Sequence, residues 1–84
     1  MMDNSELKRA HAFSAQNGKR LMKGEKCGCF YCLKIFPSNA ITRFLKDEGE
    51  TALCPYCGTD AVLGEHSGFP ITEDFLIKMK NFWF

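Results

Sequence analysis

Hydrophobic positions recur every three or four residues over about residues 5–23, with charged residues between them. The positions that share one face are Leu7, Ala10, Phe13, Asn17 and Leu21. This spacing predicts an amphipathic N-terminal helix. Asp3 and Glu6 have the separation of a capping box at its start, and Gly24 stands where the helix would end. Gly18 costs about 1 kcal/mol relative to Ala inside a helix, so two shorter helices are the alternative.

A second helical pattern covers about residues 73–84. Thr72 is the predicted N-cap, and Glu73 and Asp74 follow it in the first turn, where they favour the helix dipole. The apolar side chains of this stretch fall on one face: Phe75, Leu76, Met79, Phe82 and Trp83. The stripe predicts a C-terminal helix that packs against a core.

Shorter apolar runs lie between these two helices. Residues 33–36 form one run, after which Ser38 is a predicted N-cap for an inserted helix at about 39–46. Residues 51–53 and 61–63 are predicted to be the two strands of a hairpin over 51–63. The pattern therefore predicts a small α+β fold with a hairpin core, an N-terminal helix, a short inserted helix and a C-terminal helix.

The chain has 84 residues, which predicts one domain over 1–84. A domain of this size often needs a stabilising element, such as a metal ion or disulfides, besides its hydrophobic core. There is no apolar run long enough for a membrane span, and residues 1–6 lack the layout of a signal peptide. We therefore expect a cytoplasmic protein that does not bind membranes. The net charge of +1 argues against bulk binding to a phosphate backbone. A local basic cluster, interpreted as a solvated helix face, comprises Lys19, Arg20, Lys23 and Lys26.

The five cysteines carry the strongest chemical signal. In a reducing compartment they indicate metal or redox chemistry rather than disulfides. Two residues separate Cys29 from Cys32, and two separate Cys54 from Cys57, so each pair can aim both sulfurs at one ion. Four thiolates suit one tetrahedral, structural Zn²⁺ in a zinc-ribbon-like fold with two cysteine knuckles. The 21 residues between the pairs slightly exceed the usual ribbon spacing, and the inserted helix would account for the excess.

Cys27 leaves two alternatives open. Because a single residue separates Cys27 from Cys29, both are not expected to bind one zinc, and Cys27 is interpreted as a buried thiol beside the site. In the competing register Cys27 replaces Cys29, with four residues between the paired ligands. A redox-active Cys27 with a lowered pKa is a further alternative.

The two histidines give no catalytic pattern. His11 lies beside Ala10 near the apolar face and is interpreted as a core histidine, whereas His66 falls in a predicted surface loop and is expected to be solvated. Ser67 follows His66, but adjacent loop residues seldom form a nucleophile–base pair. A zinc ion with four thiolates has no open position for water, so we expect no enzymatic activity and no small-molecule substrate.

Several motifs resemble a family of small bacterial zinc-ribbon-like proteins labelled only "cytoplasmic protein". The resemblance covers about residues 11–84 and rests on the stretches CGCFYC at 27–32, TALCPYCG at 51–58, SGFPIT at 67–72 and the final Trp83-Phe84. The departures are Ala40, where the family tends to have an acid, and Ala61, where it tends to have Ser. The resemblance implies a compact zinc-bearing cytoplasmic protein and brings no known activity.

The leading functional hypothesis is a zinc-stabilised protein-interaction module. The alternative is a nucleic-acid-binding zinc ribbon that uses the basic cluster together with Phe30 or Tyr31. A further alternative is a thiol-redox or iron protein. Residues 54–58 resemble one knuckle of rubredoxin, but Cys32 is followed by Leu33 rather than Gly, so the other knuckle does not match.

Overall fold

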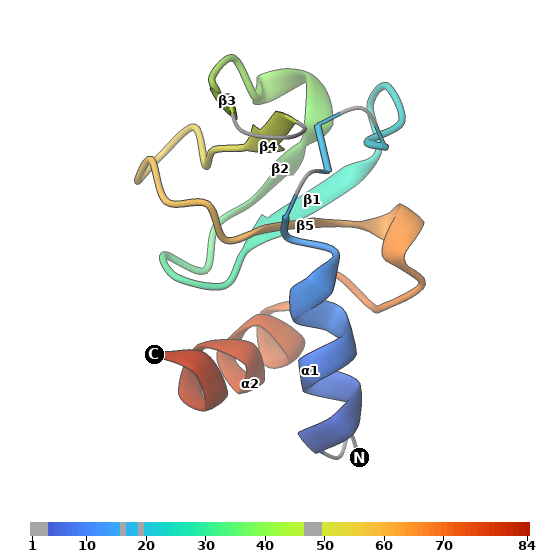
Figure 1. The fold of residues 1–84 in the computed structure, drawn as a ribbon, viewed down its shortest axis with the longest axis vertical. Helices are drawn as coiled ribbons and strands as arrows, with labels where there is room; N and C mark the ends of the chain where they lie inside the picture. Colours follow the sequence, from blue (N-terminus) through green and yellow to red (C-terminus); the bar gives the residue numbers. More distant parts are fainter. Residues whose placement is uncertain (1–3, 16, 19, 47–49) are drawn as a thin grey trace.

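A computed structural model describes residues 4–15, 17–18, 20–46 and 50–84, and within them the predicted small α+β class is confirmed. Helices at both ends of this part of the chain pack with short antiparallel strands that carry two cysteine turns (Figure 1). The elements are α1 (Asn4–Ala12), β1 (Lys26–Cys29), β2 (Ile35–Pro37), a 3-10 turn (Ser38–Ala40), β3 (Phe44–Lys46), β4 (Glu50–Ala52), β5 (Val62–Gly64), a second 3-10 turn (Glu65–Ser67) and α2 (Glu73–Trp83). None of the described helices is long and apolar enough to cross a membrane.

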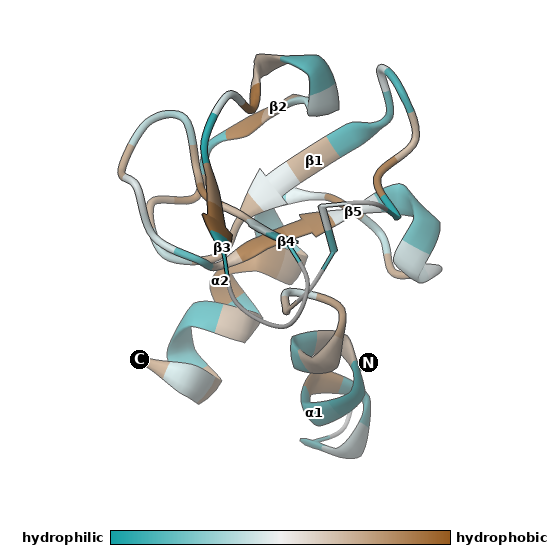
Figure 2. Cartoon of the chain, turned by 45° about the horizontal axis from the view of Figure 1, so that its top comes forward, coloured by the Kyte–Doolittle hydropathy of each residue, from teal (hydrophilic) through white to brown (hydrophobic). Residues whose placement is uncertain are grey.

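The strands form two antiparallel sheets. In the first, β1 lies between β2 and β5, so that Cys27 is opposite Phe36 on one side and Gly64 on the other. In the second, β3 pairs with β4. The predicted hairpin over 51–63 is therefore wrong, because its two strands belong to different sheets. Val62 and Leu63 of β5 are fully buried, and pairing with the central strand β1 places them in the core; Figure 2 shows β5 beside β1.

The N-terminal helix is shorter than the predicted 5–23, because α1 ends at Ala12. Beyond it the backbone is held by the sheet instead: the Gly18 N–H donates to the Glu50 carbonyl, with the nitrogen 2.6 Å from the oxygen. A Cβ at position 18 would lie 2.8 Å from that oxygen, so only glycine allows this approach. The alternative of two shorter helices is also wrong, since residues 17–18 and 20–25 form turns and irregular backbone without a second helix. The proposed Asp3 cap lies outside the described residues.

The predicted inserted helix over 39–46 is wrong as well. The chain makes one 3-10 turn at Ser38–Ala40 and then enters β3. Ser38 does not cap a helix, because its hydroxyl donates to the Met22 carbonyl (2.7 Å) and accepts from the Gly24 N–H (2.8 Å). These contacts to a turn distant in sequence compete with helix capping, and only the folded chain makes them.

The C-terminal helix agrees with its prediction. The Thr72 hydroxyl accepts a hydrogen bond from the Phe75 N–H at 3.2 Å, as an N-cap does. Phe75, Leu76 and Met79 are buried against the sheet and α1. Trp83 closes the contact between the helices, because its indole N–H donates to the Leu7 carbonyl at 3.3 Å.

Asn17 joins the two sheets. Its side-chain amide donates to the Val62 carbonyl of β5 at 2.8 Å, and its side-chain oxygen accepts from the Ala52 N–H of β4 at 2.9 Å. All three residues are fully buried. One polar side chain therefore satisfies a donor and an acceptor that belong to different sheets, where water cannot replace it.

We expect Asn17→Ala to lower the free energy of unfolding by about 2–4 kcal/mol, because it leaves a buried N–H and a buried carbonyl without partners. Urea unfolding followed by Trp83 fluorescence would measure the change. The matched control is Asn81→Ala on the exposed face of α2, which should change stability by about 0.5 kcal/mol or less. Equal effects of the two substitutions would contradict the bridging role.

Candidate metal centre

The first cysteine turn begins at the end of β1. The Cys29 sulfur accepts a hydrogen bond from the Tyr31 N–H at 3.4 Å, and the Cys29 carbonyl accepts from the Leu33 N–H at 2.8 Å. Leu33 has φ of 67°, a left-handed conformation that is uncommon for a residue with a side chain. The turn thus folds back on itself and brings Cys32 beside Cys29.

The second turn repeats the same hydrogen bonds 25 positions later in the chain. The Cys54 sulfur accepts from the Tyr56 N–H at 3.4 Å, and the Cys54 carbonyl accepts from the Gly58 N–H at 2.9 Å. Gly58 has φ of 79°, so it occupies the position of Leu33 in the first turn. The mismatch noted at Leu33 in the sequence therefore does not alter the local geometry, because leucine adopts the backbone conformation that glycine supplies in the other turn.

The two turns meet at their sulfur atoms. Cys29 Sγ lies 3.7 Å from Cys57 Sγ, and Cys32 Sγ lies 3.6 Å from Cys54 Sγ. All four sulfurs lie within 4.8 Å of one another, so the residues predicted from spacing are brought together and could hold a metal ion. In a tetrahedral site with metal–sulfur bonds of about 2.3 Å, the sulfurs are about 3.8 Å apart. The two short separations are close to this value, so the donor set fits such an ion.

Burial and mutual contact shift the pKa values of the clustered thiols. Burial, together with neighbouring thiols, raises the pKa values of Cys29 and Cys32. Burial also acts on Cys57, but hydrogen bonds from Thr59, Cys29 and Cys54 outweigh it and lower the pKa of Cys57 to about 7. Protein groups alone therefore favour a thiolate at Cys57 but not at Cys29 or Cys32, whereas a bound cation would stabilise four thiolates.

Cys27 lies outside this cluster. It is fully buried in β1, and its thiol donates to the Glu25 carbonyl at 3.6 Å. Burial, with the nearby carboxylates of Glu25 and Glu65, raises the pKa of Cys27 to about 12. These surroundings do not favour a thiolate at Cys27, and the cluster contains Cys29 rather than Cys27.

The histidines differ from each other in their surroundings. His11 is half-buried, and its ring centre lies 4.0 Å from that of Trp83. The prediction that His66 is solvated is wrong, because its side chain is only 13% exposed. The Glu25 carboxylate accepts from the His66 backbone N–H at 2.7 Å and lies 3.2 Å from its Nδ1. No feature of the sequence singled out Glu25, whose partner is 41 positions away.

Glu25 acts as a buried anchor between two loops. Its side chain is 8% exposed, and besides His66 it accepts a hydrogen bond from the Met22 N–H. Burial opposes ionisation, but the hydrogen bonds from His66 and Met22 prevail and lower the pKa of Glu25. The carboxylate is therefore favoured by the fold, and it is a structural group rather than a member of the cysteine cluster.

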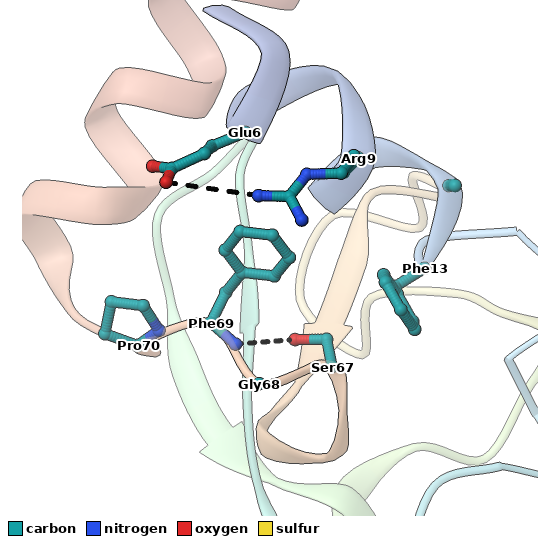
Figure 3. Close-up of a pocket in the computed structure, with 8 residues that line it drawn as sticks. Glu6, Arg9, Phe13, Ser67, Gly68, Phe69 and Pro70 are labelled. Carbon is teal, nitrogen blue, oxygen red and sulfur yellow. Dashed lines mark hydrogen bonds and ion pairs between the residues drawn. The ribbon is translucent and has the colours of Figure 1, made fainter. Parts of the chain in front are cut away.

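A hollow lies away from the sulfurs, between α1 and residues 67–70 (Figure 3). Its volume is about 650 Å³. Arg9 on its wall is paired with Glu6 at 4.0 Å and lies 5.9 Å above the centre of the Phe69 ring. The charge on this wall is therefore already paired within the protein.

No family model, curated protein or solved structure matches this chain. The resemblance to a zinc-ribbon-like family thus stays a prediction. Four cysteines from two equivalent turns form a cluster that could hold a metal ion.

The structure predicts opposite outcomes for two neighbouring cysteines. Cys27→Ser should retain the bound metal and lose at most about 1–3 kcal/mol, because it changes one buried polar group. Cys29→Ser should lose most of its metal affinity, because a hydroxyl is a poor ligand for a thiolate-binding ion. Metal content after gel filtration would measure both. Retention by Cys29→Ser with loss by Cys27→Ser would instead establish the competing register.

The lowered pKa of Glu25 predicts that the free energy of unfolding depends on pH. Because its pKa is lowered on folding, its contribution to stability is present above the unfolded value of about 4.5 and is lost as the pH falls through the lower folded value. Glu25→Gln should therefore cost about 1.5–3 kcal/mol at pH 7, and the difference from wild type should shrink below pH 4.5. Urea unfolding across pH would measure it.

Both proteins carry the same cysteines, so loss of metal in acid affects them equally. The matched control is Glu73→Gln, since Glu73 is an exposed acid in the first turn of α2. Its effect should be below about 1 kcal/mol. A Glu25→Gln penalty that persists unchanged in acid would show that side-chain shape, rather than the carboxylate charge, matters at this position.

Proposed function

We propose that the protein is a non-enzymatic interaction module whose fold is stabilised by one structural Zn²⁺. The observation that carries the proposal is the cluster of four sulfurs from Cys29, Cys32, Cys54 and Cys57. Four thiolates at tetrahedral separations are the donor set typical of structural zinc. Zinc has no redox chemistry, which suits a stabilising role.

A structural role follows from how the ligands are used. With four protein ligands, the ion has no open position at which water or a substrate could be activated. Cys29 ends β1 in one sheet, and Cys54 follows β4 of the other sheet closely. One zinc ion thereby links the two sheets, as a small domain with a limited core requires.

The surface supports an interaction role with a protein partner. Several large hydrophobic side chains remain exposed, including Tyr31 and Tyr56, which occupy equivalent positions in the two cysteine turns. Aromatic residues are enriched at protein interfaces because they bury much area at a small entropic cost. The two turns that would hold the ion thus also expose tyrosines that a partner could contact. We also propose that the protein acts in the cytoplasm.

The nucleic-acid alternative is less well supported. Phe30 is only 1% exposed, so its ring is not accessible for base stacking. Tyr31 is exposed, but it follows one end of β1, whereas Lys26 of the basic cluster begins that strand at its other end. An aromatic platform and its basic residues should be adjacent to bind a single strand.

Purified protein should contain about one equivalent of zinc and be colourless, which elemental analysis and an absorption spectrum would show. Removal of the ion should unfold much of the domain, because the binding energy of structural zinc, about 10–16 kcal/mol, is comparable to or larger than the stability of a small domain. Chelation should therefore shift Trp83 fluorescence and abolish the cooperative unfolding transition.

The same preparation distinguishes the alternatives. A red-brown protein with thiolate-to-iron absorption would replace zinc by iron. A metal-free chain that keeps native fluorescence and cooperative unfolding would show that the ion is not structural. Re-addition of Zn²⁺ after chelation is the control for irreversible damage, and it should restore the native spectrum.

A further inference from the structure

A second, smaller hollow lies beside the first cysteine turn. It has a volume of about 150 Å³ and is formed where the end of α1, the first turn and the end of α2 meet residues 60–61. None of the cysteines lines it. This volume suits a single side chain, because pockets for drug-sized ligands are typically about 300–1,000 Å³.

Aromatic rings form one part of its wall. Phe30 is buried, Phe84 is 60% exposed, and their ring centres lie 5.8 Å apart. His11 adds a third ring 6.0 Å from Phe30. Next to this hollow the chain holds one of its own cations against the same ring cluster: Lys80 Nζ lies 5.4 Å from the centre of Tyr31, which in turn contacts Phe84. The arrangement therefore favours positive charge at the ring faces.

Acceptor groups form another part of the wall. Asp60 is exposed, and it has no ion-pair or hydrogen-bond partner among the residues that the structure describes. The Ser14 hydroxyl also lines the hollow, but Ser14 is only 3% exposed and its hydroxyl donates to the His11 carbonyl at 2.7 Å, so Asp60 is the accessible acceptor. In the larger hollow, the Glu6 carboxylate is already paired with Arg9 of the same chain, so it is less available to a cationic ligand (Figure 3).

We propose that this hollow binds the guanidinium group of an arginine presented by a protein partner. A guanidinium is planar, so it can stack on Phe84 while its N–H groups donate to the Asp60 carboxylate. Arginine is also among the residues that most often dominate binding energy at protein interfaces. The inference rests on the proposed interaction role, and it specifies the chemistry of the partner.

The test uses the zinc-loaded full chain, labelled with ¹⁵N, and a short glycine peptide with one central arginine. Titration should shift the amide signals of Asp60 and Phe84 saturably. A peptide with citrulline, which has the same shape without the charge, should bind at least about tenfold more weakly. Asp60→Asn should weaken arginine binding by a similar factor, whereas the control Asp74→Asn, at the opposite end of α2 from Phe84, should not.

The proposal is overturned by equal binding of the two peptides, by an Asp60→Asn variant that binds like wild type, or by no binding at about 10 mM peptide. A thymidine oligonucleotide that binds at Phe84 when the arginine peptide does not would make nucleic acid the occupant. If Asp60→Asn does not fold, Phe84→Leu removes the stacking ring instead and should weaken binding. Zinc content of each sample separates the two claims: a zinc-loaded, folded protein that ignores the peptide refutes the arginine site alone.

Discussion

The structure depends on the close approach of four sulfur atoms from two separate parts of the chain. One pair ends the central strand β1, and the other follows β4 in the second sheet. Without a cation, Cys29 and Cys32 carry little negative charge, because burial and neighbouring thiols raise their pKa values. The fold thus assembles a set of ligands whose favourable charged state requires a bound ion.

Besides the sulfur cluster, two buried polar side chains connect separate segments of the fold. Asn17 connects β4 to β5, and Glu25 connects the turn at Met22 to the loop at His66. Each satisfies backbone groups on segments far apart in sequence, which strands of three or four residues cannot do by themselves. A domain with such short strands therefore holds its sheets together through individual side chains as well as through its hydrophobic core.

The features that could be predicted from the sequence are those governed by nearby residues. The C-terminal helix has its N-cap at Thr72 and its apolar face within one stretch, and each cysteine pair fits within one tight turn. The elements that were predicted wrongly are governed by distant contacts. Gly18 meets Glu50, and the Ser38 hydroxyl meets Met22 and Gly24, so neither residue continues or starts a helix. The His66 environment depends on Glu25, and no local pattern revealed that pair.

The four sulfurs are not equally accessible, and this gives the cluster an inner and an outer side. Cys29 and Cys54, the first cysteine of each turn, are buried, whereas Cys57 is exposed and Cys32 is intermediate. Although the two turns repeat the same hydrogen bonds, the second turn therefore faces solvent more directly. An ion held here would be exchanged through the Cys57 side, since an incoming thiol or chelator reaches that sulfur before the others. The rate of metal transfer to or from the protein would then be set at one ligand, while the buried pair keeps the two sheets together.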